Sequence, residues 1–323
     1  MPNDAHILLL DSRQVAALLE PNEVLAAVTE AFVLHSEGKG RVFPVVREKL
    51  AGGGVFGIKA GDVPDQALLG FKAAGFWPDN RALGGEPHQA TVVLIDPATG
   101  RPDCIIDGNA ITTMRTGAAG GLGLINLARS DSRSLAVFGT GVQAKVQLDF
   151  ALRLMPSIRQ VRYVTINGLP DPAFEARFQG VCDLAHETNP DAAVAGSDVV
   201  ITATPGGGPL FSAAAVRPGT HLTCVGADTK GKRELPPGLL ERARLVVDDR
   251  AQAQQIGETQ WAPEIPCLEL GEILAAKAQF SRTAADITIF DMTGLALQDL
   301  TVARLLRDRA RTSRTGTRIA WPW

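Results

Sequence analysis

Residues 135–144 read Leu135-Ala-Val-Phe-Gly139-Thr-Gly141-Val-Gln143-Ala144. An apolar run typical of a buried strand leads directly into Gly-x-Gly-x-x-Ala, and a helical pattern follows it. In such a turn the first glycine allows a tight bend, the second lets the backbone approach a pyrophosphate, and the small third residue lets the helix pack on the strand. Helix N–H groups then point at the phosphates. The stretch therefore predicts dinucleotide binding by Gly139, Thr140, Gly141, Val142, Gln143 and Ala144.

Short apolar runs continue on the C-terminal side of this turn and alternate with helical patterns. Such alternation predicts a parallel, doubly wound α/β sheet. The expected strands are residues 135–138, 161–166, 198–203, 221–225, 245–247 and 287–290.

The first third of the chain has a different pattern. Residues 12–36 predict helix, capped by Ser12 and interrupted at Pro21, and the strand-like runs that follow are broken by Gly and Pro. We expect an antiparallel or mixed sheet with flanking helices there. A glycine-rich helix over residues 112–128 must pack closely on something, because glycine costs helix propensity. A last helix over residues 297–309 is expected to precede a basic, mobile tail.

Composition excludes several classes of protein. The 323 residues suggest about two domains, and a net charge of −3 argues against a nucleic-acid binder. No apolar run approaches the roughly 18 residues that a membrane helix needs. The N-terminal residues lack the cationic start of a signal peptide. The four cysteines lie far apart with no CxxC spacing, so neither a metal site nor a disulfide framework is supported. We expect a cytoplasmic protein with reduced thiols.

The ends of the next strands supply further candidates. Asn167 stands at the tip where an acid would bind a ribose hydroxyl or an arginine would favour a 2′-phosphate, so the choice between NAD and NADP stays open. Thr202, Ala203 and Thr204 end another strand, where hydroxyls either line the ligand crevice or simply stop the strand.

Val225, Gly226 and Asp228 lie at the end of the following strand. An acid beside the nicotinamide can transfer a proton, although an aspartate after a strand is more often a cap or a turn residue.

Cations occur among apolar residues in the first third of the chain, at Arg47, Lys59, Lys72 and Arg115. A lysine in a partly dry site has a lowered pKa and serves as an acid or base, and arginine binds carboxylates through two N–H bonds. Each cation taken alone is more often a solvated or structural charge. As a set beside a nucleotide fold they indicate an anionic substrate. His88 has a catalytic and a more common structural interpretation.

Six motifs in order along nearly the whole chain resemble the ornithine cyclodeaminase/mu-crystallin family. They are His88-Gln-Ala-Thr91, Asp107-Gly-Asn-Ala-Ile-Thr112-Thr-Met-Arg115-Thr116, Gly139-Thr-Gly-Val-Gln143-Ala144, Ala195-Gly-Ser-Asp198-Val-Val-Ile-Thr-Ala-Thr204, Val225-Gly-Ala-Asp228-x-x-Gly231-Lys232-x-Glu234-Leu235 and Asp291-Met-Thr-Gly294-Leu-Ala-Leu-Gln298-Asp299.

The resemblance implies an NAD(P)-dependent homodimer that exchanges hydride at the α-carbon of an amino or imino acid. It implies a substrate-binding and dimerisation domain of α+β type, from residues 1–125 and 300–323, and a Rossmann domain from residues 126–299.

The resemblance also implies roles for single residues. Lys72 matches the family's active-site lysine, Arg115 the arginine that holds the substrate carboxylate, and Asp228 an acid found in cyclodeaminases and alanine dehydrogenases alike. Arg47 matches a second carboxylate-binding arginine, although Pro44-Val-Val-Arg47 has one residue more than the family's Pro-x-Arg. Thr116 and Gly294, within two of the motifs, complete the expected cofactor-binding set.

One departure from the family pattern concerns the substrate. Ornithine cyclodeaminases carry an acid before a Met-Pro pair, whereas Val55-Phe-Gly-Ile-Lys59-Ala-Gly61 has a cation and no Met-Pro. A distal substrate ammonium facing Lys59 would be repelled, which favours a substrate with a neutral side chain or with a second carboxylate paired with Lys59. We therefore expect reduction of an α-imino acid by NAD(P)H, with iminosuccinate, reduced to aspartate, as the specific expectation. The alternatives are a cyclodeaminase-type lyase that uses NAD catalytically and a mu-crystallin-like binding protein without turnover.

Overall fold

A computed structural model describes residues 5–321, and the chain divides into two compact units. The first unit comprises Met1–Arg115 and Leu295–Trp323, and the second comprises Thr116–Gly294. The divisions thus fall at residues 115–116 and 294–295, rather than at the expected 125–126 and 299–300. The predicted α/β class, a parallel Rossmann sheet beside a second domain, is confirmed.

The first unit is built on a mixed sheet in the order β16-β1-β7-β6-β5-β4-β2, and β3 also pairs with β4. Only β1 and β7 run parallel to each other; the other described pairs are antiparallel. Its strands are β1 (His6–Leu10), β2 (Arg41–Val42), β3 (Val46–Lys49), β4 (Val55–Val63), β5 (Leu68–Phe76), β6 (His88–Ile95), β7 (Pro102–Asp107) and β16 (Thr317–Ala320).

The prediction of a mobile tail after the last helix is wrong. Residues 317–320 form β16, which pairs antiparallel with β1 and sets Ile319 opposite Ile7. The backbone N–H and C=O groups of β1 would otherwise form an unpaired sheet edge.

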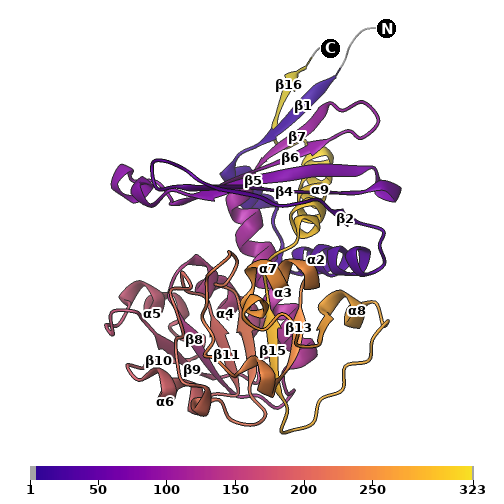
Figure 1. Cartoon of the computed structure of the whole chain (residues 1–323). Helices are drawn as coiled ribbons and strands as arrows, with labels where there is room; N and C mark the ends of the chain where they lie inside the picture. Colours follow the sequence, from indigo (N-terminus) through magenta and orange to yellow (C-terminus); the bar gives the residue numbers. More distant parts are fainter. Residues whose placement is uncertain (1–4, 322–323) are drawn as a thin grey trace. The chain divides into compact units, whose positions relative to one another are not determined.

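Helices cover one face of this sheet: α1 (Ser12–Leu18), α2 (Pro21–Ser36) and α9 (Ala296–Ser313), with short 3-10 turns at Pro64–Gln66 and Pro78–Leu83. Asp11, not Ser12, caps α1, in a capping box with Gln14. Helix α9 packs against β4, β5 and β6 on one side and against α2 on another (Figure 1). Leu297 and Leu300 pack over Gly61 and Gly70 of the sheet, with Cδ2 atoms 3.4 Å and 3.0 Å from where a Cβ on each glycine would lie.

The second unit contains a fully parallel sheet in the order β10-β9-β8-β11-β12-β15-β13-β14. The strands are β8 (Ser134–Phe138), β9 (Gln160–Val164), β10 (Asp183–His186), β11 (Val199–Thr202), β12 (His221–Cys224), β13 (Ala243–Val247), β14 (Cys267–Glu269) and β15 (Ile287–Asp291). The order reverses beside β8, which creates the crevice where such sheets bind ligands. All six expected strands are present, and β10 and β14 are additional.

Each face of this sheet has its own apolar core. One core forms around Leu148 of α4 and Phe174 of α5, and the other around Val194 of α6 and Ala253 of α7. The helices are α3 (Gly108–Leu127), α4 (Val142–Leu154), α5 (Pro172–Phe178), α6 (Pro190–Ala195), α7 (Arg250–Ile256) and α8 (Leu270–Leu274), with 3-10 turns at Ala213–Ala215, Leu240–Arg242 and Glu258–Trp261.

The close packing expected of the glycine-rich helix is confirmed. A Cβ atom on Gly120 would lie 1.9 Å from Oε1 of Gln147, and one on Gly123 would lie 2.2 Å from the Phe290 ring. The Gln147 side chain in turn donates to the carbonyl of Thr116 at 2.8 Å. Helix α3 therefore lies directly on α4 and β15.

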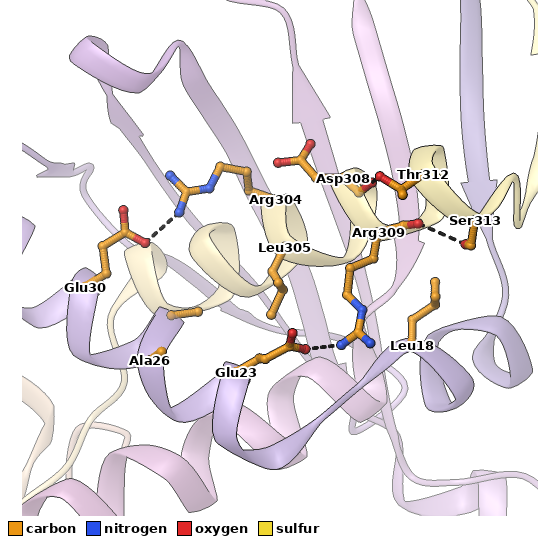
Figure 2. A pocket seen from close by; sticks show the side chains of 11 residues that line it. Leu18, Glu23, Ala26, Glu30, Arg304, Leu305, Asp308, Arg309, Thr312 and Ser313 are labelled. Carbon is orange, nitrogen blue, oxygen red and sulfur yellow. Dashed lines mark hydrogen bonds and ion pairs between the residues drawn. The ribbon is translucent and has the colours of Figure 1, made fainter.

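A surface groove of about 680 Å³ lies between α2 and α9 (Figure 2). Its charged side chains are paired, Arg304 with Glu30 at 2.6 Å and Arg309 with Glu23. Its lining includes none of the predicted site residues. No helix within residues 5–321 is both long and apolar enough to span a membrane.

Candidate functional site

A buried charge cluster lies in the first unit, where β5, α3 and α9 meet. Lys72 Nζ lies 2.9 Å from Oδ1 and 2.8 Å from Oδ2 of Asp299, and it also donates to Oγ1 of Thr112 at 3.2 Å. Arg115 reaches the same carboxylate through Nε at 3.2 Å and donates from Nη1 to Gln298 at 3.1 Å. Lys72, Arg115 and Asp299 are only 4 %, 7 % and 1 % exposed. Two predicted site residues thus share one buried counter-ion.

Burial shifts the protonation of this cluster. Loss of solvation lowers the pKa of Lys72 to about 7, because the attraction of Asp299 only partly offsets it, while Arg115 and Lys59 lower it further. Burial would raise the pKa of Asp299, but Lys72 and Arg115 outweigh it and hold that pKa below its usual range. Near neutral pH the lysine can therefore act as an acid or a base, and the aspartate stays ionised.

The sheet register places two further predicted cations on the same face as Lys72. Lys59 of β4 stands directly opposite Lys72 of β5, and Arg47 of β3 stands opposite Gly57, two residues before Lys59. Opposed residues project to the same side of a sheet, and so do residues two apart. Lys59 is partly buried and close enough to influence both Lys72 and Asp299, whereas Arg47 is exposed.

His88 is partly buried at the start of β6. Its Nδ1 lies 3.2 Å from Oδ1 of Asn109, and burial, assisted by the charge of Lys72, lowers its pKa. The imidazole is therefore neutral near pH 7.

Asp299 and Gln298 belong to this cluster but were not among the predicted site residues. Both are fully buried at the start of α9. An acid directly after a glutamine in an otherwise apolar helix start, Leu295-Ala-Leu-Gln298-Asp299, was the available signal. Buried charges are paired, so that acid required a cation from elsewhere.

In the second unit, the turn after β8 has the geometry that a dinucleotide requires. Gly139 has φ of 99°, and a Cβ there would lie 2.7 Å from the carbonyl oxygen of Ala203. No atom lies within 4 Å of the position that a Cβ on Gly141 would take. Helix α4 begins at the next residue, and no described side chain caps its N–H groups. Glycine backbone and helix N-terminus thus form a cradle that fits a pyrophosphate.

The predicted ribose position is occupied by Asn167, whose Oδ1 accepts a hydrogen bond from the backbone of Leu169 at 3.1 Å. Asp171 interacts with the glycine turn. A hydrogen bond from the Thr140 side chain, followed by bonds from backbone N–H groups of α5, lowers the pKa of Asp171. An ionised carboxylate therefore lies beside the turn.

The ends of β11 and β12 are held together by a residue that the sequence did not single out as functional. The buried Glu234 carboxylate accepts hydrogen bonds from the Thr202 hydroxyl at 2.7 Å, from both N and Oγ1 of Thr204 at 2.7 and 2.6 Å, and from Gly226 N at 2.8 Å. Val225 N bonds the carbonyl of Thr202, and Ala203 N bonds β8. These predicted cofactor residues are thus brought together.

The remaining predicted residues of the second unit vary in exposure. Asp228 pairs with Lys232 at 2.7 Å and accepts from the Thr229 hydroxyl, and it is partly exposed. Thr116 is buried, and its carbonyl accepts a hydrogen bond from the Gln147 side chain. The backbone N of Gly294 donates to the Asp248 carboxylate. Val142 is exposed at the start of α4.

Two further acids, Glu258 and Asp291, are buried below Glu234. Glu258 Oε1 accepts from the backbone N of Glu234 at 2.5 Å, and Asp291 accepts from the backbone N of Glu258 at 3.0 Å. Burial, strengthened by the charge of Asp291, raises the pKa of Glu258 to about 8. Burial likewise raises the pKa of Asp291 to about 7, against hydrogen bonds from Thr259.

Replacing Asp299 by asparagine leaves Lys72 and Arg115 buried without a counter-ion. We expect Asp299→Asn to lower the free energy of unfolding by about 3 kcal/mol. Asp308→Asn on the same helix loses only an exposed pair with Arg307 and is the matched control, with an expected effect below about 1 kcal/mol. Urea unfolding followed by circular dichroism measures both. Equal losses in the two variants would contradict a buried ion pair at Asp299.

The contribution of Glu258 to the free energy of unfolding should fall as pH rises from about 5 to 8. In that range the unfolded chain ionises Glu258 near its usual pKa of 4.5, while the folded chain keeps the proton. Such a group costs up to about 1.4 kcal/mol of stability per pH unit. Glu258→Gln keeps the Oε1 acceptor and cannot ionise, so its free energy of unfolding relative to the wild type should rise over this pH range, as measured by urea unfolding. The exposed control Glu241→Gln should follow the wild type, and unchanged slopes in both variants would contradict a protonated Glu258.

Three comparisons with known proteins agree with one another. The model of the ornithine cyclodeaminase/mu-crystallin family matches residues 6–314. The iminosuccinate reductase of Paracoccus denitrificans is 34 % identical over 94 % of this chain and 97 % of its own. Its crystal structure with NAD+ has a TM-score of 0.88, at 32 % identity, covering 98 % of this chain and 99 % of that one. An archaeal alanine dehydrogenase dimer with bound NAD has a TM-score of 0.91, at 31 % identity and the same coverage. The chain belongs to the ornithine cyclodeaminase/mu-crystallin family.

Proposed function

We propose that this protein is an NAD(P)H-dependent reductase that converts an α-imino acid to an L-amino acid, and that the substrate is a dicarboxylate of the iminosuccinate type. The observation that carries the proposal is the buried cluster of Lys72, Arg115 and Asp299, with Lys59 on the same face of the sheet. The second unit holds the cofactor at the glycine turn, and the first holds the substrate.

The charge of the cluster favours two carboxylates on the substrate. Lys59 stands opposite Lys72 on the same face of the sheet, where it supplies a cation that a second substrate carboxylate can contact. Similarity to the Paracoccus iminosuccinate reductase supports the same substrate class. A substrate with a distal ammonium, such as ornithine, would meet Lys59 as a like charge.

Each side chain of the site has a separate role in the proposed reaction. Arg115, whose guanidinium is oriented by Gln298 and Asp299, holds the α-carboxylate. Bound NAD(P)H supplies a hydride to the α-carbon. Lys72 Nζ, with its pKa near 7, donates the proton that the substrate nitrogen gains as the C=N bond is reduced. Arg47 assists the α-carboxylate, Lys59 binds the distal carboxylate, and Asp228 is a second proton-transfer group.

The cofactor binds through the residues around the two strand ends and the glycine turn. The left-handed Gly139, the open space at Gly141 and the uncapped start of α4 support binding of a nicotinamide dinucleotide, NAD(H) or NADP(H). We further propose that the protein works in the cytoplasm, where Cys104, Cys182, Cys224 and Cys267 stay reduced.

The function is tested by NADH and NADPH oxidation at 340 nm with oxaloacetate plus ammonia, pyruvate plus ammonia, and pyrroline-2-carboxylate. We expect oxaloacetate plus ammonia to be preferred. Lys59→Ala should reduce kcat/KM for that substrate by about 100-fold, the effect of losing one desolvated ion pair, and change the pyruvate reaction by less than about threefold.

The exposed Lys49, near the end of the neighbouring strand β3, provides the control Lys49→Ala, which should behave as the wild type. An equal loss on both substrates would contradict a distal-carboxylate role for Lys59. Ammonia release from ornithine with catalytic NAD+, and no cofactor oxidation with any imine, would instead identify a cyclodeaminase. Cofactor binding without any turnover would identify a binding protein.

We propose also that two copies of the chain associate through the face of the first sheet that α9 does not cover. A cross-strand row on that face is apolar and partly exposed, formed by Leu9, Ala60, Phe71, Val93 and Ile105. An apolar row across five neighbouring strands is a surface that a soluble monomer rarely exposes. Similarity to the archaeal alanine dehydrogenase dimer supports a second copy as the occupant.

Sedimentation velocity measures this association directly. We expect the wild type to sediment as a dimer and Phe71→Glu to sediment as a monomer, because a charge at the centre of the row would be buried without a partner. Phe76→Glu is the matched control: it lies on the same strand but on the opposite face, is already 44 % exposed, and should stay dimeric. A dimer that survives Phe71→Glu would place the interface elsewhere.

A further inference from the structure

The buried carboxylate of Glu234 occupies an unusual place in the second unit. Glu234 is 0 % exposed, yet it receives four hydrogen bonds from the ends of two different strands. Oε1 accepts from N and Oγ1 of Thr204, and Oε2 accepts from Oγ1 of Thr202 and N of Gly226. It thus joins the end of β11 to the end of β12.

The strand order shows which part of a dinucleotide these ends would meet. The strand order reverses beside β8, whose glycine turn is expected to receive the pyrophosphate. Strand β9 lies on the side of the ribose position at Asn167. That side takes the adenosine half. The other mononucleotide-binding half, formed by β11 and β12, takes the nicotinamide half.

Several contacts keep Glu234 in place. Leu210 N donates to the Glu234 carbonyl at 2.9 Å, and Glu258 accepts from the Glu234 N. Asp291 in turn accepts from the Glu258 N. Gly226 has no room for a side chain, since a Cβ would lie 2.5 Å from the Glu234 carboxyl carbon. The backbone of Glu234 is therefore fixed by Leu210 and Glu258, and its carboxylate fills the space between the strand ends.

We propose that Glu234 is a positioning residue for the nicotinamide half of the cofactor: by tying Thr204 to Gly226 it shapes the crevice wall on which that half rests. The inference rests on the proposed function, because it requires the second unit to bind a nicotinamide dinucleotide. Being buried, Glu234 acts through the strand ends and not by touching the cofactor.

A glutamine cannot replace this carboxylate. Each of its two oxygens faces one backbone N–H, that of Thr204 or that of Gly226. Whichever way an amide is turned, its NH2 group meets one of these N–H donors, and the strand ends must move apart. Glu234→Gln therefore changes the crevice with almost no change in side-chain volume.

The test compares NADH with ADP-ribose, which lacks the nicotinamide, by isothermal titration of the wild type and variants. We expect Glu234→Gln to weaken NADH binding about tenfold or more and ADP-ribose binding by less than about twofold. Thr202→Val removes one hydroxyl donor at a position that is itself fully buried, and it should weaken NADH binding in the same direction by a smaller factor. The exposed control Glu241→Gln should bind both ligands as the wild type does.

Each outcome decides the proposal. Equal weakening of both ligands by Glu234→Gln would assign a general structural role to Glu234, and unchanged NADH binding would remove any role in the crevice. Should Glu234→Gln fail to fold by circular dichroism, Thr202→Val decides: selective weakening of NADH supports the proposal, and its absence overturns it. A wild type that binds neither ligand would instead overturn the proposed cofactor, and the inference with it.

Discussion

The first unit depends on the buried ion pair between Lys72 and Asp299. A lysine on the covered face of a sheet loses its hydration, and without a counter-ion the charged form would be strongly disfavoured. The counter-ion comes from α9, 227 residues away along the chain. The C-terminal helix must therefore return to the N-terminal sheet, which explains why the first unit is assembled from both ends of the chain around a continuous second unit.

The second unit buries charge in a different way. Glu234 is surrounded by four hydrogen-bond donors rather than by a cation. Burial raises the pKa of Glu258 to about 8 and that of Asp291 to about 7, which favours their uncharged forms. A carboxylate held by N–H and O–H donors has a defined orientation, because each lone pair faces a fixed group. An ion pair can tolerate a change of partner, as substrate binding at Arg115 would require. The hydrogen-bonded Glu234 therefore suits a crevice wall that must keep its shape. The ion pairs of Asp299 suit a site at which one anion replaces another.

Much of the fold could be predicted because its signals are local. The Rossmann strands are continuous apolar runs, and the turn at Gly139 follows from residues within ten positions of one another. The short strands β10 and β14 were missed because sequences such as Asp183-Leu-Ala-His186 have too few apolar residues for a pattern, and pairing with a neighbouring strand determines them. Asp299 was missed as a site residue for a related reason. Its importance comes from its contact with Lys72, which no local pattern contains, whereas the cations themselves stood out against apolar neighbours.

The protonation of Lys72 connects this architecture to the proposed chemistry. With a pKa near 7, the lysine is only partly protonated before substrate arrives, because burial removes its hydration and Arg115 and Lys59 add to the effect by opposing its charge. A substrate carboxylate bound to Arg115 would weaken that opposition, and a second carboxylate at Lys59 would weaken it further. Anion binding would therefore raise the pKa of Lys72 and supply the ammonium that reduction of an imine consumes. The two cations beside Lys72 thus make the proton donor responsive to the substrate it serves.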